Sequence, residues 1–171
     1  MATITEHELL LISKAKSEKL RNYAEGVSLT QRSGKSIEKL RSVVITDRMR
    51  LARAQLQDAV FAARKDHPRY RTAISRAYYA MYHAARAVTY LSHGGDDHEE
   101  HSALPKNLPP DFPEVEIWRN KLKNARLERN KADYDPYPKQ NTYYEQSYET
   151  IITDAKLMIK ITQQYIKERG Q

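Results

Sequence analysis

The chain has 171 residues, of which 40% are hydrophobic and five are glycine, and this composition is typical of one globular, helix-rich domain with or without an appendage. The absence of cysteine excludes disulfides, thiolate metal sites and a cysteine nucleophile. The net charge of +7 is concentrated in residues 48–92, where nine basic residues, eight of them arginine, accompany two acidic ones. Such a region favours either a surface for nucleic acid or another acidic partner, or an ordinary solvated helix pair.

The first segment predicts an amphipathic helix over residues 4–24, which ends at the glycine- and serine-containing stretch EGVSLTQRSGKS. Its apolar positions are Ile4, Leu9, Ile12, Ala15 and Leu20. The run LLLI inside this helix is flanked by charge, and it is too short for a signal-peptide core or a membrane span. We therefore expect a cytoplasmic protein without membrane contact, in which residues 1–47 form an N-terminal helical extension.

A second helix is predicted from about Ser36 to Lys65, with some irregularity around Val43–Thr46. Small and apolar residues recur in it at intervals of three and four, which gives the helix a narrow apolar stripe. The stripe consists of Met49, Ala52, Leu56, Ala59 and Ala63. Pro68 ends this helix, because proline cannot continue a helix and disfavours helix in the residue before it.

The segment from about 69 to 92 predicts the clearest helix of the chain. Alanines occupy most of one face, so the backbone of another helix can approach closely. This face is lined by Ala73, Ala77, Ala80, Ala84, Ala87 and Leu91. Tyr78, Tyr79 and Tyr82 add rings that could stack on bases, but tyrosines at helical spacing more often pack against a neighbouring helix, and we favour packing.

Two glycines, four prolines and an acidic run predict a loop over residues 93–113. His93, His98 and His101 lie in this loop beside several carboxylates, which raises the question of a metal site. The two histidines of HEEH are three residues apart, whereas the H-E-x-x-H motif of zinc proteases places them four apart on one helix face. We therefore expect solvated loop histidines and no metal.

A further helix is predicted from Pro113 to about Ala132. Its apolar face consists of Val115, Trp118, Leu122 and Ala125. The same spacing places Arg129 next on the inward face, where a guanidinium needs partners because an unpaired buried charge is very costly. Two interpretations are open: a structural ion pair with Asp133 or a neighbouring helix, or a cationic group in a cleft that is poised for phosphate.

The last helix is predicted from about Thr142 to Lys167. Residues at intervals of three and four form its inward face: Tyr144, Tyr148, Ile151, Ala155, Met158, Thr162 and Tyr165. No stretch of the chain alternates convincingly with a period of two. The sequence therefore predicts an all-α protein, an up-and-down bundle of four to five helices over residues 48–168 that follows the N-terminal extension.

Two motifs in this arrangement carry a family resemblance. The stretch SRAYYAMYHAARAV is followed by a polar loop and then by RNKADYD at the end of the next helix. Together they resemble the HEPN domain, whose name stands for higher eukaryotes and prokaryotes nucleotide-binding, over about residues 48–168. The resemblance implies an all-α bundle, usually a homodimer, that needs no cofactor. It also implies a protein directed at RNA, often a metal-independent ribonuclease of a toxin–antitoxin or antiphage system.

The family motif is an arginine followed after four to six residues by a histidine, commonly with a polar residue beside the arginine. Arg129 and Asn130 match its first half. The positions where the histidine would fall hold Tyr134, Asp135 and Pro136. A histidine suits proton transfer because its pKa lies near neutrality, whereas the pKa of tyrosine lies near 10.

The catalytic residues that the resemblance implies are Arg129, Asn130, Asp133 and Tyr134. The arginine would contact the scissile phosphate, the asparagine would orient it, and the aspartate and tyrosine would complete the site and handle the proton. His83 or His101 could instead reach the site from elsewhere in the fold.

The predicted RNA contacts are Arg69, Arg71, Arg76, Arg86 and Tyr79. The arginines would supply salt-dependent affinity for the RNA backbone. The expected partners are a second copy of the chain and RNA or a nucleotide. Two alternatives stay open: a non-catalytic binding module that pairs with a nucleotidyltransferase, and a purely structural role for the pair of Arg129 and Asp133.

Overall fold

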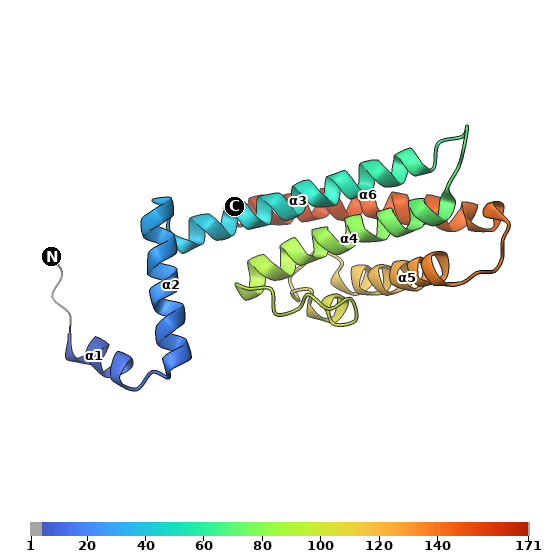
Figure 1. Ribbon diagram of the computed structural model, residues 1–171. Helices are drawn as coiled ribbons and strands as arrows, with labels where there is room; N and C mark the ends of the chain where they lie inside the picture. The colour runs from blue at the N-terminus through green and yellow to red at the C-terminus, as the bar shows by residue number, and fades with distance from the viewer. Residues whose placement is uncertain (1–4, 171) are drawn as a thin grey trace. The chain divides into compact units, whose positions relative to one another are not determined.

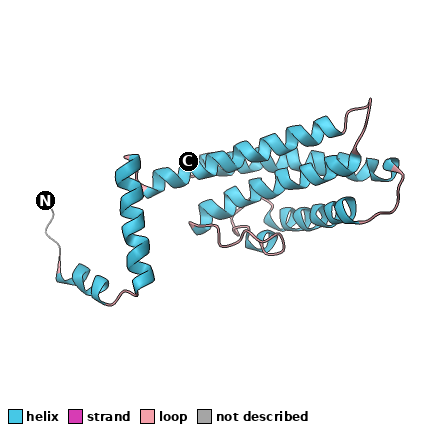
Figure 2. Cartoon of the chain, in the orientation of Figure 1, coloured by secondary structure: helices cyan, strands magenta, loops and turns pink. Residues whose placement is uncertain are grey.

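The computed structural model describes residues 5–170, and every regular element among these residues is a helix (Figure 2). In chain order the elements are α1 (Glu6–Ser13), α2 (Ser17–Ser33), α3 (Ile37–Ala62), α4 (Tyr70–His93), the short 3₁₀ helix η1 (Leu104–Asn107), α5 (Val115–Tyr134), a second 3₁₀ helix η2 (Asn141–Tyr144) and α6 (Glu145–Glu168). The predicted all-α fold is confirmed. None of the described helices is long and apolar enough to cross a membrane.

The chain divides into two compact units, one ending at Ser42 and the other beginning at Val43, so that the division falls within α3. The division predicted from the sequence falls after residue 47.

The helices of the first unit differ from the prediction. The expected single helix over residues 4–24 breaks after Ser13, and α2 continues through Gly26 as far as Ser33; residue 4 lies outside the described residues. A glycine inside a helix costs only about 1 kcal/mol relative to alanine, so Gly26 does not end α2. Gly34 does, because its left-handed φ of 63° lets its N–H bond to the carbonyl of Thr30.

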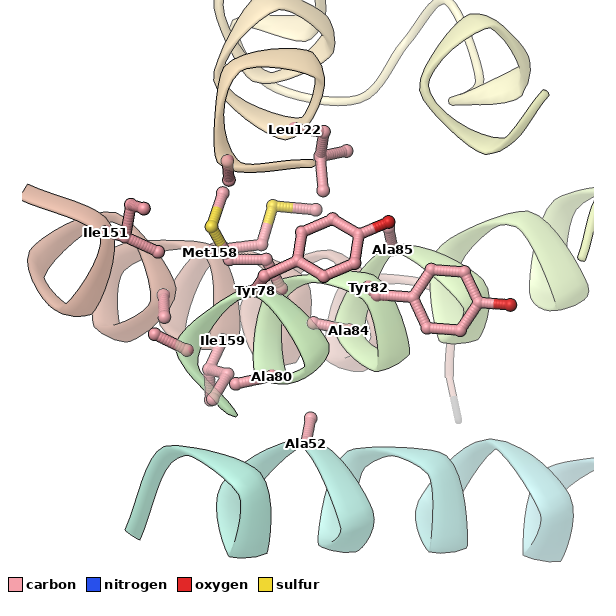
Figure 3. Packing of buried hydrophobic residues seen from close by; sticks show 14 of the residues in the cluster. Ala52, Tyr78, Ala80, Tyr82, Ala84, Ala85, Leu122, Ile151, Met158 and Ile159 are labelled. Atoms are coloured by element: carbon pink, nitrogen blue, oxygen red, sulfur yellow. The ribbon is translucent and has the colours of Figure 1, made fainter. Parts of the chain in front are cut away.

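Helix α4 is the central helix of the second unit and packs closely on α6 and α5 (Figure 1). Its alanine face is fully buried: Ala73, Ala77, Ala80, Ala84, Ala85 and Ala87 all have 0% of their surface exposed. Figure 3 shows Ala80 facing Ala52 of α3, with Ile159 of α6 close to it in the same buried cluster. The predicted close approach of another helix to this face is therefore confirmed.

Helices α3 and α5 cover other sides of the core. The stripe on α3 is buried or partly buried as predicted, but α3 is one continuous helix, so the irregularity expected around Val43–Thr46 is wrong. On α5, Trp118, Leu122 and Ala125 are buried, and Arg129 follows them on the inward face one turn later. The spacing in the sequence thus located a buried arginine at the end of a core helix.

Candidate functional site

Arg129 is almost completely buried, with 6% of its surface exposed. Its Nη1 donates hydrogen bonds to Oδ1 of Asn130 at 3.1 Å and to the hydroxyl of Tyr134 at 3.3 Å, and its Nη2 donates to the hydroxyl of Tyr79 at 3.2 Å. Its Nε lies 3.6 Å from Oδ2 of Asp133 and makes no hydrogen bond among the described residues. One carboxylate and three neutral oxygens therefore surround the buried cation.

Three aromatic rings complete the surroundings of this guanidinium. Its central carbon lies 5.3 Å from the ring centres of Tyr78 and Tyr79 and 5.8 Å from that of Tyr134. At these distances the faces of the rings stabilise the cation. Two of the rings come from α4 and one from the end of α5, so the relative position of these helices sets the geometry of the site.

The site opens to solvent at its outer edge, because Tyr134 is 73% exposed while Tyr78 is 2% exposed. The hydroxyls of Tyr134 and Tyr79 accept from Arg129, so each keeps its own proton to donate to another group. The arrangement thus offers O–H donors, beside a buried positive charge, to an anion such as phosphate. Asp133 is the anion already present, and its Oδ2 also accepts from the hydroxyl of Ser75 at 3.3 Å.

The loop after α4 is held against the bundle by its acidic residues. Gly94 ends α4 with a left-handed φ of 82°. Asp96 then forms a two-pronged ion pair with Arg86, and its Oδ2 lies 2.9 Å from Nη2 of Arg48 on α3. Glu99 lies 3.4 Å from the Arg86 guanidinium. These ion pairs therefore fix the path of the loop, which has no regular secondary structure in this part.

This loop brings His101 into the aromatic cluster. Its ring stacks on Tyr82 with 4.3 Å between ring centres, and its Nδ1 shares a hydrogen bond of 2.6 Å with the hydroxyl of Tyr78. The expectation of solvated loop histidines is therefore wrong for His101. The acidic run GDDHEE, opposite the arginines of the preceding helices, was the signal that could have indicated this placement.

The surroundings of the two histidines near Arg129 lower the pKa of both and so disfavour their protonated forms. Burial, followed by the charges of Arg86 and Arg48, lowers the pKa of His83 to about 4. The pKa of His101 is also lowered, first by burial and then by the charges of Arg129 and Arg126. Among residues 5–170, no group of three or more His, Asp or Glu side chains is arranged to hold a metal ion.

Arg71, one of the predicted RNA contacts, braces the chain between α5 and α6. Its guanidinium donates to the carbonyl oxygens of Ala132 at 3.0 Å, Asp135 at 2.6 Å and Pro138 at 2.8 Å. It also lies over the ring of Tyr144, 4.5 Å from the ring centre. These contacts give Arg71 a structural role that the charge count does not reveal.

The other predicted RNA contacts differ in their availability. Tyr79 belongs to the Arg129 site, and the charge of Arg86 is offset by Asp96. Arg69 and Arg76 are exposed, and Arg76 donates to the side-chain oxygen of Gln55 at 3.2 Å. The two exposed arginines are therefore the ones that a ligand could reach without breaking an ion pair.

The protein is thus a helical bundle in which a buried arginine lies at the junction of two core helices, in a site that opens to solvent. A family model described as the HEPN domain matches residues 45–165, and the chain belongs to this family. A search of the curated proteins finds no match. Membership of this family supports a function related to nucleotides or RNA.

Proposed function

We propose that this HEPN protein is directed at RNA, in a toxin–antitoxin or defence system, and that it binds and cleaves the RNA backbone at Arg129 without a metal ion. The observation that carries the proposal is the cation itself: Arg129 is 6% exposed, yet it lies beside hydroxyl donors at an opening to solvent. A buried guanidinium with few competing charges binds an anion more strongly than one in water, because the local dielectric constant is low.

The chemistry that suits this site is attack by the ribose 2′-hydroxyl on the adjacent phosphorus. The 2′-hydroxyl loses its proton to water, the bond from phosphorus to the 5′ oxygen breaks, and the 5′ oxygen takes up a proton, which leaves a 2′,3′-cyclic phosphate and a 5′-hydroxyl. Arg129 would stabilise the negative charge on the phosphorane, and Asn130 would orient the guanidinium through its 3.1 Å hydrogen bond. Tyr134, the most exposed member, would donate a hydrogen bond from its hydroxyl to a phosphate oxygen, while Asp133 keeps the arginine in place.

The test is incubation of the purified protein with total RNA and with tRNA, with and without EDTA. Cleavage that survives EDTA and is lost in Arg129→Ala supports the proposal. The matched control is Lys123→Ala, which removes the same charge from an exposed position of the same helix and should leave cleavage unchanged. Intact RNA in every arm would contradict the ribonuclease proposal.

A second candidate is a non-catalytic binding module that pairs with a nucleotidyltransferase. The observation that favours it is Tyr134, which occupies a position where the family motif would have a histidine. Binding of RNA without cleavage, together with a stable complex with a nucleotidyltransferase encoded beside it, would support this candidate. In either case we propose a homodimer, which sedimentation should reveal as about twice the chain mass of 19.9 kDa.

A further inference from the structure

We infer that His101 is a catalytic residue of the Arg129 site, and that it donates a proton from Nε2 to the leaving 5′ oxygen. This inference rests on the proposed ribonuclease function. His101 comes from the loop between α4 and α5, outside the segment in which the family motif has its histidine.

His101 lies near Arg129, because both contact the same two tyrosines, Tyr78 and Tyr79. The centre of the Tyr79 ring lies 5.3 Å from the guanidinium carbon and 5.9 Å from the centre of the imidazole. The imidazole is therefore no more than about 11 Å from the guanidinium. A phosphodiester group that accepts a hydrogen bond of about 3 Å from the imidazole and another from the guanidinium spans a distance of the same order. One phosphodiester group can therefore contact both.

The imidazole ring is oriented by its hydrogen bond to Tyr78. Nδ1 points at the hydroxyl of Tyr78, which is buried and has no other hydrogen-bond partner among residues 5–170. In the neutral imidazole the Tyr78 hydroxyl therefore donates to Nδ1, and the ring proton is on Nε2. In the imidazolium both nitrogens carry a proton, and Nδ1–H donates to the Tyr78 oxygen instead. Nε2 makes no hydrogen bond to a described residue, and it is not among the buried polar atoms that lack a partner. It therefore faces solvent, on the side of the ring away from Tyr78.

The imidazole ring is held in place before any ligand binds. Tyr82 stacks on it and donates its hydroxyl to the carbonyl of Glu99, two residues earlier in the loop. Asp96 ties the start of the loop to Arg86 and Arg48. A donor that is fixed in this way needs no reorganisation during the reaction.

The charged and titratable groups that face the imidazole come from two helices. They are Tyr78, Tyr79, Tyr82, His83 and Arg86 on α4, and Arg126 and Arg129 on α5. Burial lowers the pKa of His101, and the charges of the three arginines lower it further. The protonated imidazole is therefore a stronger acid than usual. A bound phosphate offsets these charges and so raises the fraction of protonated His101.

The 2′ oxygen attacks phosphorus and loses its proton to water, the bond from phosphorus to the 5′ oxygen breaks, and the 5′ oxygen takes the Nε2 proton of the imidazolium. The imidazole is left neutral and regains a proton from water. Removal of such a general acid typically costs about 100-fold or more in rate.

The test compares His101→Gln with wild type on an RNA that wild type cleaves and on its 5′-phosphorothiolate analogue. The sulfur leaving group needs no proton donor, so the variant should be at least about 100-fold slower on RNA and close to wild type on the analogue. The rescue also shows that the variant is folded. The control is His98→Gln, in the same loop, which should match wild type on both substrates.

The outcomes separate the inference from the proposed function. If Arg129→Ala is inactive and His101→Gln cleaves RNA like wild type, or is equally slow on both substrates, the His101 inference is overturned while the ribonuclease stands. If wild type leaves both substrates intact, the ribonuclease proposal fails, and the catalytic role of His101 fails with it.

Discussion

The Nη2 of Arg129 donates a hydrogen bond of 3.2 Å to the hydroxyl of Tyr79, and this contact joins the end of α5 to the middle of α4. The donor is on a core helix and is buried, while the acceptor is only partly buried. The hydrogen bond to Arg129 is therefore made between the side chains of two core helices. A change that shifts α4 against α5 should disturb the site even without touching Arg129.

Asp133 is the anion beside Arg129, and in the proposed function a phosphate competes with it. Asp133→Asn keeps the shape of the side chain but removes its charge, so Arg129 becomes more available. We expect the affinity for a 2′-O-methyl RNA, which cannot be cleaved by its own hydroxyl, to rise about threefold to tenfold, and the free energy of unfolding to fall by about 0.5–1 kcal/mol. Fluorescence anisotropy and urea unfolding measure the two quantities.

The control for this prediction is Glu128→Gln, which makes the same charge change on the same helix at a residue that pairs with Lys131. It should leave the affinity near that of wild type. A lower affinity in Asp133→Asn would mean that the carboxylate itself assists RNA binding.

Arg71 is expected to matter for stability. Arg71→Lys keeps the charge but cannot span the carbonyl oxygens of Ala132, Asp135 and Pro138 with one ammonium group. We expect the free energy of unfolding to fall by about 2 kcal/mol, with RNA affinity unchanged under conditions where the variant is folded. Arg76→Lys, at an exposed position, should change stability by less than about 0.5 kcal/mol. An equal fall in the free energy of unfolding in the two variants would contradict a bracing role for Arg71.

The helices of the bundle could be predicted from the sequence because their apolar residues follow the period of a helix. The same spacing placed Arg129 on the inward face, where the structure also has it. The end of α2 was misplaced, since a glycine within a helix and a glycine that ends one look alike in the sequence. Only the left-handed φ of 63° at Gly34 distinguishes it from Gly26. The break between α1 and α2 was missed because residues 14–16 include no glycine or proline that would indicate it.

The role of the loop was missed for a different reason. The position of His101 depends on Asp96, which pairs with Arg48 and Arg86 from two separate helices. Such pairs join residues that are far apart in the sequence, and composition reports only that the loop is acidic. The bracing role of Arg71 is equally non-local, because its three acceptors lie more than sixty residues further along the chain.

Arg69 and Arg76 are exposed, and we expect them to contact the RNA backbone. Each phosphate contact on a single strand contributes about 0.7 to the slope of log K against log salt concentration. The double change Arg69→Ala with Arg76→Ala should therefore make the slope shallower by about 1.4. The control is Lys160→Ala with Lys167→Ala, two exposed basic residues of α6, which should leave the slope unchanged. An equal loss of slope in both pairs would indicate that only net charge matters.

His83 should make stability depend on pH. Burial lowers its pKa to about 4 in the folded protein, whereas the unfolded chain takes up a proton near pH 6.5. Stability from this group is therefore complete above pH 6.5 and falls as the pH drops toward 4, by about 2 kcal/mol. His83→Phe should have a flatter profile between pH 7 and 4.5 in urea unfolding. An unchanged profile would assign the pH dependence to other groups, His101 first among them, since its pKa is lowered too.

The most direct test of the central claim is the affinity of Arg129→Ala and Lys123→Ala for a 2′-O-methyl RNA, measured at one salt concentration beside the melting temperature of each variant. Loss of a buried charge-assisted contact should weaken binding by Arg129→Ala at least about tenfold, whereas Lys123→Ala stays within about twofold of wild type. If Arg129→Ala lowers the melting temperature and binds the RNA as wild type does, Arg129 and Asp133 form a structural ion pair, and the site proposed for RNA is not there.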